Sequence, residues 1–186
     1  MNNTVFYHCP ICGNVITKLS NSGVTPSCCG QEMEELVPKT QDPEVGEKHV
    51  PVMTCKEGCM LHISIGAVIH PMTAAHHIQF IYLQFKDKDG HMGGRFVNLN
   101  AEDRPECDIC TCSIKVEAVY EYCNIHGLWK TECNEENCPD LKCLEQKDCC
   151  QQQEPTNRCY AQSAEEKQKC EQQEREGNNT DSNKQF

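Results

Sequence analysis

The hydrophobic pattern beyond residue 46 consists of short apolar runs separated by polar turns. The runs are rich in β-branched and aromatic residues, and they cover residues 50–54, 61–69, 78–85, 94–97 and 114–122. Runs of this length and composition predict strands, and we expect no helix between them. A polar Asp-Lys-Asp-Gly turn at 87–90 favours a hairpin. We therefore predict a small all-β domain, an antiparallel sandwich.

The run at 114–122 alternates most clearly. Its apolar positions are Ile114, Val116, Ala118, Tyr120 and Tyr122. The charged positions between them are Lys115, Glu117 and Glu121. Because successive side chains of a strand point to opposite faces, we expect the apolar set to share one face of the sheet and the charged set to share the other.

The chain divides by composition into four segments. Residues 1–37 are cysteine-rich, and residues 38–46 are polar, contain prolines and are predicted to be a linker. Residues 47–131 hold the predicted strands. Residues 132–186 are rich in Gln, Glu, Asn and Cys and have almost no apolar side chain to bury, so we predict a mostly disordered tail.

Cysteine content and charge narrow the class of protein. The chain has 17 cysteines in 186 residues, which indicates either a disulfide scaffold or metal binding. The N-terminus lacks the basic and apolar segments of a secretory signal, so we expect a cytoplasmic protein whose cysteines bind metal. A formal net charge of −11 argues against nucleic acid and anionic membranes as partners. No apolar run is long enough to cross a bilayer.

Four cysteines in the first segment have the spacing of a metal site. Cys9 and Cys12 form a Cys-x-x-Cys pair followed by glycine, and Cys28 and Cys29 are adjacent and also followed by glycine. Four thiolates suffice for a tetrahedral iron or zinc, and the spacing does not choose between the two metals. The segment is too short to build a core, so we expect it to need the metal in order to fold.

A second candidate site combines imidazole and thiolate. Cys123 and His126 lie three residues apart at the end of the last predicted strand, and three further histidines are expected at strand ends. These are His49, His70 and either His76 or His77, which compete because neighbouring strand residues face opposite ways. Together they make a five-ligand mixed site. His8, His62 and His91 are assigned no role.

These residues resemble desulfoferrodoxin, the two-iron class of superoxide reductase. The resemblance runs from residue 5 to about residue 131 and covers both predicted domains in the expected order. Cys9, Cys12, Cys28 and Cys29 match the desulforedoxin-like centre of that family. The catalytic domain is matched by Glu-Lys-His-Val-Pro at 47–51, by His-Pro-Met at 70–72 followed by His76, and by Cys-Asn-Ile-His-Gly at 123–127 with Trp129.

The resemblance implies a desulforedoxin-like domain followed by an immunoglobulin-like β-sandwich, usually in a homodimer. It implies one iron on the four N-terminal cysteines and a catalytic ferrous ion in an Fe(His)4Cys site. The implied imidazoles of that site are His49, His70, His76 and His126, and the implied axial thiolate is Cys123. The spacing from His70 in the family pattern favours His76 over His77.

The implied activity is the one-electron reduction of superoxide to hydrogen peroxide, with electrons from a rubredoxin-like donor, for oxygen detoxification in an anaerobe. Lys48 is expected to steer the superoxide anion. Glu47 is expected to occupy the sixth position of the resting ferric site. Without the family resemblance, an ordinary solvated charge pair would be the more common role for Glu47 and Lys48.

Some residues depart from the family pattern. Phe80 stands where many members carry tryptophan, and Cys107, Cys110 and Cys112 form a cysteine-rich loop. These three cysteines could join tail cysteines in an additional cluster, but the tail lacks a compact Cys-x-x-Cys, and we favour a disordered appendage. The competing function is a non-catalytic metal-binding or electron-carrier protein. The five-ligand set favours the enzyme, because structural zinc closes its shell at four ligands.

Overall fold

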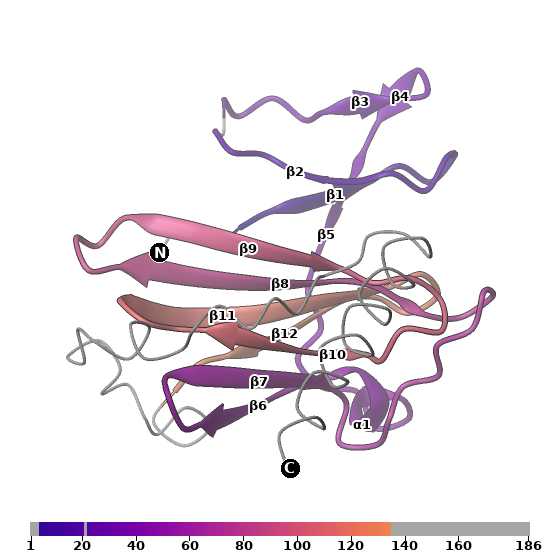
Figure 1. The fold of residues 1–186 in the computed structure, drawn as a ribbon. Coiled ribbons are helices and arrows are strands. Elements are labelled where there is room, and N and C mark those ends of the chain that lie inside the picture. Colours follow the sequence, from indigo (N-terminus) through magenta and orange to yellow (C-terminus); the bar gives the residue numbers. More distant parts are fainter. Residues whose placement is uncertain (1–3, 21, 135–186) are drawn as a thin grey trace, which may run out of the picture. The chain divides into compact units, whose positions relative to one another are not determined.

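The structure is a computed structural model that describes residues 4–20 and 22–134. Regular structure in these residues is almost entirely β (Figure 1). The N-terminal segment forms five short strands: β1 (Phe6–His8), β2 (Val15–Thr17), β3 (Ser27–Cys28), β4 (Gln31–Glu32) and β5 (Glu34–Leu36). They pair as a sheet in the order β2-β1-β5 and a two-stranded β3-β4 ribbon. An all-β fold is therefore confirmed.

Two antiparallel sheets follow. The first has the order β10-β7-β6 and consists of β6 (Pro51–Lys56), β7 (Met60–Ile65) and β10 (Glu106–Cys110). The second has the order β12-β11-β8-β9 and consists of β8 (Ile78–Asp87), β9 (Met92–Asn98), β11 (Ile114–Cys123) and β12 (Gly127–Glu132). Figure 1 shows the two sheets stacked. The predicted sandwich is present, and its immunoglobulin-like topology stays a prediction.

The main core lies between these two sheets. Leu61, Ile63 and Ile65 of β7 are buried against Ile81 and Leu83 of β8 in a single apolar cluster. The alternation of β7 fits this placement, because its other side chains are only partly buried. Burying side chains of this size stabilises the fold by roughly 1.5–3 kcal/mol each. The sandwich is therefore a rigid scaffold for the loops at its ends.

A β-bulge in β11 reverses the face on which its side chains lie. The pairing register with β8 shifts between Val116 and Ala118, and an extra residue in one strand turns all later side chains over. Ile114 and Val116 join the core between the sheets, whereas Ala118, Tyr120 and Tyr122 join a separate cluster on the other face. The prediction that these five apolar residues share one face was therefore wrong.

The same bulge turns Glu121 and Cys123 inward. Cys123 belongs to the core cluster, and both side chains are fully buried. We expected Glu121 to share a face with Lys115 and Glu117, but the register shift separates it from them. One inserted residue thus determines which side chains reach the end of the sandwich.

The outer face of the second sheet is covered by β1. Phe6 is 1% exposed and packs among Phe80, Tyr82 and Tyr120, with ring centroids 5.5–5.7 Å apart. The Thr4 amide donates a hydrogen bond to Oε1 of Gln84. Phe80, which stands where tryptophan was expected, belongs to this aromatic cluster.

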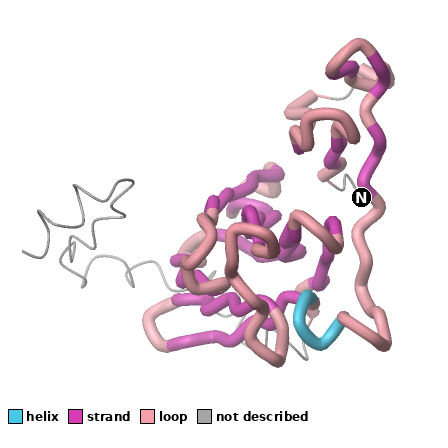
Figure 2. Tube along the Cα trace, turned by 90° about the vertical axis from the view of Figure 1, so that its right-hand side faces the viewer, coloured by secondary structure: helices cyan, strands magenta, loops and turns pink. Residues whose placement is uncertain are grey.

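Three details differ from the predicted elements. A four-residue helix, α1 (Gly46–His49), stands where we expected a strand to begin, and Figure 2 shows it among strands and loops. The cysteine-rich loop contains β10, whose Cys107 and Ile109 face the core. One further strand, β12, follows β11 and extends to Glu132. The predicted disordered tail otherwise falls outside the described residues.

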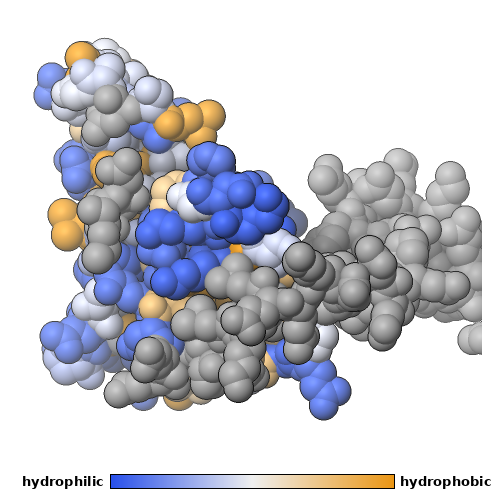
Figure 3. All heavy atoms as spheres, turned by 90° about the vertical axis from the view of Figure 1, so that its left-hand side faces the viewer, coloured by the Kyte–Doolittle hydropathy of each residue, from blue (hydrophilic) through white to orange (hydrophobic). Residues whose placement is uncertain are grey.

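The predicted hairpin at 87–90 is confirmed. It joins β8 to β9, and Gly90 has a left-handed φ of 85° with its amide bonded to the carbonyl of Asp87. Hydrophilic residues gather at the end of the sandwich that carries this turn (Figure 3). Because β8 runs from one end of its sheet to the other, the loop before Ile78 lies at the opposite end. In the described part of the chain, we find no helix with the length and apolarity to span a membrane.

Candidate metal centres

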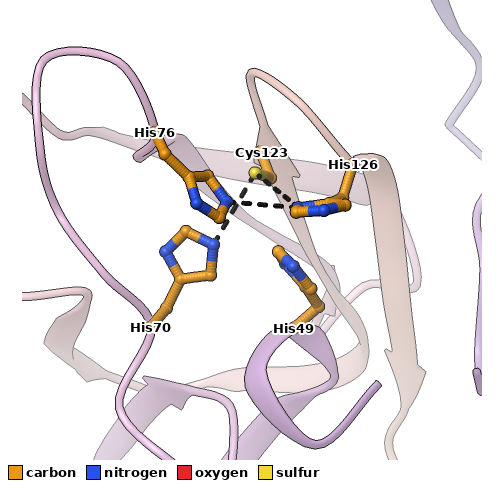
Figure 4. Close-up of side chains that lie close together, drawn as sticks. All are labelled: His49, His70, His76, Cys123 and His126. Carbon is orange, nitrogen blue, oxygen red and sulfur yellow. Dashed lines mark hydrogen bonds between the residues drawn. The ribbon is translucent and has the colours of Figure 1, made fainter. Parts of the chain in front are cut away.

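Five metal-binding side chains converge at the end of the sandwich opposite the β8–β9 turn. Their donor atoms all lie within 4.8 Å of one another: His49, His70, His76, Cys123 and His126 (Figure 4). His49 ends α1, His70 and His76 belong to the loop between β7 and β8, and Cys123 and His126 flank the turn between β11 and β12. We call these five residues the His4Cys group. The sequence predicted all five, and the structure brings them together.

The segment before β6 positions His49, the last residue of α1. Oδ1 of Asp42 accepts hydrogen bonds from the amides of Glu44 and Val45, which fixes the turn leading into α1. Gly66 at the end of β7 packs on the other side of α1. Its φ is +81°, and a Cβ there would lie 2.7 Å from Cα of Lys48. Only glycine tolerates both conditions, so Gly66 allows α1 to sit close to the sheet.

Asn124 ties the two ligand-bearing loops to each other. Its Oδ1 accepts from the His77 amide at 2.9 Å, and its Nδ2 donates to the Ala75 carbonyl at 2.9 Å. Its own amide donates to the His77 carbonyl at 3.2 Å. These bonds fix the loop that carries His76 against the strand that carries Cys123. The backbone of His77 makes two of the three bonds, and the ring of His77 faces the Thr73 carbonyl. His76 is therefore the histidine that joins the group.

Two buried side chains that the sequence did not assign to the site hold His49. Oε1 of Glu121 and Nδ1 of His49 share a hydrogen bond of 3.2 Å, and the ring of Trp129 stacks on the imidazole with a centroid distance of 4.9 Å and an angle of 12°. Because Nδ1 is held by Glu121, His49 offers Nε2 to the group. The signal for Glu121 was its position two residues before Cys123, which places both side chains on one face of a strand.

Burial determines the protonation of the donors. It lowers the pKa of His49 to about 3 and that of His70 to about 4, and the neighbouring imidazoles add to the effect. Burial also lowers the pKa of His76. These three imidazoles are therefore neutral at pH 7, the form that binds metals. Burial raises the pKa of the Cys123 thiol, while the amides of His126 and Ile125 act against that rise.

The distances within the group fit one transition-metal ion. Nε2 of His76 lies 3.2 Å from Nδ1 of His126, and Sγ of Cys123 lies 3.5 Å from the same Nδ1 and 3.6 Å from Nε2 of His70. Ligands about 2.0–2.3 Å from a common ion lie roughly 3–4.5 Å from one another. Neutral imidazoles with a thiolate are also the donors that such ions prefer. The residues present therefore fit a metal.

Glu47 and Lys48 precede His49 in α1, and both side chains are exposed. Among the described residues, neither makes a salt bridge, so they do not form the ordinary charge pair with each other. The Lys48 charge contributes to the lowered pKa of His76, after burial and the nearby imidazoles. Lys48 thus acts electrostatically on the half-buried side of the His4Cys group.

The four N-terminal cysteines form the second predicted group. Cys9, Cys12, Cys28 and Cys29 have their sulfur atoms within 4.8 Å of one another. Cys29 has a left-handed φ of 52°, and this unusual backbone lets adjacent cysteines turn toward one centre. The Cys12 amide lowers the pKa of Cys9 to about 7, whereas hydrogen bonds from the other thiols, Cys12 first, raise that of Cys29 to about 12. The four sulfur atoms are so close that, without a cation, a thiolate at one of them disfavours a thiolate at the next. A bound metal cation allows all four to be thiolates.

The remaining cysteines with described positions do not form a third cysteine group of this kind. Cys107 is buried in the core, and burial raises the pKa of its thiol to about 12. Cys110 lies on the other face of β10, with its sulfur 3.1 Å from that of Cys112. The structure thus separates Cys107 from Cys110 and Cys112. The additional cluster with tail cysteines falls outside the described residues.

Two family models match the chain. The desulfoferrodoxin model matches residues 41–132, and the model of the desulfoferrodoxin N-terminal domain matches residues 2–36. Desulfoferrodoxin from Nitratidesulfovibrio vulgaris is 38% identical over 131 residues, which cover 70% of this chain and 98% of that protein. Superoxide reductase from Pyrococcus abyssi is 39% identical over 99 residues, which cover 47% of this chain and 86% of that protein.

A solved structure has a similar fold. The superoxide reductase from Treponema pallidum matches with a TM-score of 0.58 and 23% sequence identity, over 70% of this chain and 98% of that one. At this level of identity the match supports the fold of the described residues. The desulfoferrodoxin and superoxide reductase relatives, at 38% and 39% identity, are the matches that support similarity in sequence.

Proposed function

The chain belongs to the desulfoferrodoxin family, and on this premise we propose that it is a superoxide reductase, an oxidoreductase with superoxide as its substrate. The reaction takes one superoxide, one electron and two protons and gives one hydrogen peroxide. The observation that carries the proposal is the convergence of four imidazoles and one thiolate at the end of a rigid sandwich. Its cofactors are two iron centres, one at the four-cysteine group and one at the His4Cys group.

We propose His49, His70, His76, Cys123 and His126 as the ligands of the catalytic iron. Iron bound there supplies the electron that reduces superoxide. Five protein donors leave one position of a six-coordinate ion for a small substrate, unlike a structural zinc site with a closed shell of four. The competing function, a non-catalytic metal-binding protein, does not account for a fifth donor.

The chain's own residues prepare the site for an anion. His49, His70 and Cys123 are fully buried, whereas His76 and His126 are half-buried, so solvent reaches the group from the side of these two histidines. Lys48 lies on this side and provides a local cation in a chain of net charge −11. We propose that Lys48 steers superoxide to the site and that Glu47 would serve as a further ligand of an oxidised iron bound there in the resting state. The protons come from solvent.

The other expectations remain proposals. The N-terminal iron on Cys9, Cys12, Cys28 and Cys29 belongs to a desulforedoxin-like domain of residues 1–37, joined by residues 38–46 to the catalytic domain of residues 47–131. The electron donor is a rubredoxin-like protein, the assembly is a homodimer, and the site of action is the cytoplasm. The two family models match residues 2–36 and residues 41–132, which supports a division into two domains between these matches.

Metal analysis with visible absorption and EPR tests the proposed function. Protein purified without oxygen should contain two irons per chain, and mild oxidation should produce a thiolate-to-ferric charge-transfer band. Cys123→Ser should abolish this band and leave the signal of the four-cysteine iron intact. Zinc at both centres, with no redox-active band, would overturn the enzyme and leave a metal-binding protein.

A further inference from the structure

Lys39 lies in the segment that the sequence predicted to be a linker, yet its backbone is fixed to the catalytic domain. Its amide donates to the Leu128 carbonyl at 2.9 Å, and its carbonyl accepts from the Lys130 amide at 2.8 Å. Lys39 therefore pairs with β12 opposite Trp129 in an isolated parallel bridge. These are main-chain bonds, so they persist whatever side chain residue 39 carries.

The side chain of Lys39 lies over the only tryptophan of the chain. Its Nζ is 5.2 Å from the centroid of the Trp129 ring, within the range of a cation–π interaction. Trp129 is fully buried and stacks on His49 with a centroid distance of 4.9 Å. The two contacts place the Lys39 ammonium within about 10 Å of the His49 ring. Lys39 is itself exposed, but the ring that it contacts is fully buried, so part of the path from its charge to His49 runs through protein, where a charge is screened less than across water.

The groups near Trp129 that can carry a negative charge indicate the role of the Lys39 cation. The His4Cys group contains a thiolate, and the buried carboxyl of Glu121 lies beside it. Lys39 is an exposed cation whose backbone is held by β12, and the Trp129 ring contacts both its ammonium and the imidazole of His49.

We propose that Lys39 is a positioning residue of the catalytic centre: its cation, held over Trp129, favours the ferrous state of an iron bound at the site. A nearby positive charge favours the less positive of two oxidation states, so it raises the reduction potential. This inference rests on the proposed function, because it assumes that iron occupies the His4Cys group. It assigns a role in the reaction to a residue outside that group.

The test compares the reduction potential of the His4Cys iron in four variants. Lys39→Met keeps the length of the side chain and removes its charge, and Lys39→Gln removes both the charge and part of the stem. Each should raise the ferric-to-ferrous ratio at a fixed applied potential by about three- to tenfold, which corresponds to about 30–60 mV for a one-electron couple. Lys39→Arg, which keeps the charge and the cation–π contact, should restore the wild-type potential.

The matched control is Lys115→Gln. Lys115 is an exposed lysine of β11, the strand that ends at Cys123, and it lies eight residues from that ligand, roughly 27 Å along a strand. The Lys115→Gln variant removes the same charge at a greater distance from the site. Its effect on the reduction potential should therefore vanish at 0.1–0.2 M salt, where the Debye length is about 8–10 Å. The effect of Lys39→Met should persist at that salt concentration.

Fluorescence of the metal-free protein separates this inference from the proposed function. Lys39→Met should shift the emission of Trp129, and Lys39→Arg should not. If the protein binds no iron, the proposed function fails while this contact is still measured. A wild-type potential in Lys39→Met, or an equal shift in Lys115→Gln at 0.1–0.2 M salt, would overturn the role of Lys39.

Discussion

Lys48 is the exposed cation nearest in sequence to a buried ligand of the His4Cys group, and it follows Glu47 in α1. Superoxide is an anion and the chain is net negative, so the protein repels its substrate at long range. At a separation of a few ångströms, one local cation outweighs a diffuse negative charge that salt screens. We therefore expect this side chain to act on the rate of capture and not on the binding of the metal.

Replacing Lys48 with alanine should slow the second-order reaction with superoxide by about three- to tenfold. It should also weaken the salt dependence of that rate, and the iron content should stay the same. Pulse radiolysis at several ionic strengths measures both quantities. Lys115→Ala, a change of equal charge at a distant site, should leave the rate almost unaltered. A wild-type rate and salt slope in Lys48→Ala would remove the steering role.

The residues of the two metal groups could be predicted from sequence because each lies in a short motif. Cys123 and His126 share one turn, and Cys9 and Cys12 share another, so local spacing already indicates a site. Glu121 was missed for a physical reason: strict alternation assigns it to a face with other charged residues, and only the bulge between Val116 and Ala118 turns it inward. A bulge shifts the pairing register by one residue, and the sequence of apolar and polar residues gives no clear signal of where it occurs.

At the scale of elements, the site depends on how loops are tied to strands. Asn124 connects the loop that carries His76 to the end of β11 through three hydrogen bonds. Groups that orient metal ligands in this way commonly account for 10- to 100-fold of metal affinity. The loop before β8 has few other polar contacts to the β11–β12 turn among the described residues, so its position depends on this side chain.

Asn124→Ala should therefore lower the affinity of the His4Cys group for iron by about 10- to 100-fold. Competition with a chelator, followed through the charge-transfer band, measures the loss. Asn98→Ala, at an exposed position at the end of β9, is the matched control and should bind iron like the wild type. Equal affinities in the two variants would show that the loop holds its position without Asn124.

The docking of β1 on the sandwich depends on one aromatic side chain. Phe6→Ala should lower the free energy of unfolding by about 3 kcal/mol, because it empties a buried site among three aromatic rings. Leu19→Ala, at a fully exposed position (101%), should change it by less than about 0.5 kcal/mol. Urea unfolding measures both variants. Equal stabilities would mean that the N-terminal strand contributes little to the fold.

Element prediction succeeded where apolar alternation was long and failed where cysteines interrupted it. β6, β7, β8, β9 and β11 overlap the five predicted runs. β10 was taken for a loop because its Cys107 and Cys110 were counted as candidate ligands, although Cys107 packs in the core as a small apolar side chain. α1 was missed because four residues are too few to show a helical period.

At the scale of the whole molecule, the buried histidines link folding to pH. The pKa of His49 and that of His70 fall from an ordinary 6.5 to about 3 and about 4. Between pH 6.5 and about 4, the unfolded chain binds protons that the folded chain does not, so the stability of the metal-free protein falls as pH decreases. Each histidine contributes up to about 1.4 kcal/mol per pH unit. The raised pKa of Glu121, caused by burial, acts in the opposite direction.

The free energy of unfolding of the metal-free protein should therefore decrease from pH 7 to pH 5 by about 1–3 kcal/mol. Glu121→Gln should make the decrease steeper, because it removes the opposing group. Denaturant titrations at several pH values give the slope. Stability that is independent of pH would mean that the histidines are solvated in the metal-free fold.

We propose that the His4Cys group reduces superoxide and does not dismutate it. The most direct measurement is the yield of hydrogen peroxide and oxygen when the reduced, iron-loaded protein reacts with a limiting pulse of superoxide. Reduction predicts one hydrogen peroxide for each superoxide consumed, no oxygen, and one oxidised iron for each turnover without a donor. One hydrogen peroxide and one oxygen for every two superoxides, or no reaction faster than that of Cys123→Ser, would contradict it.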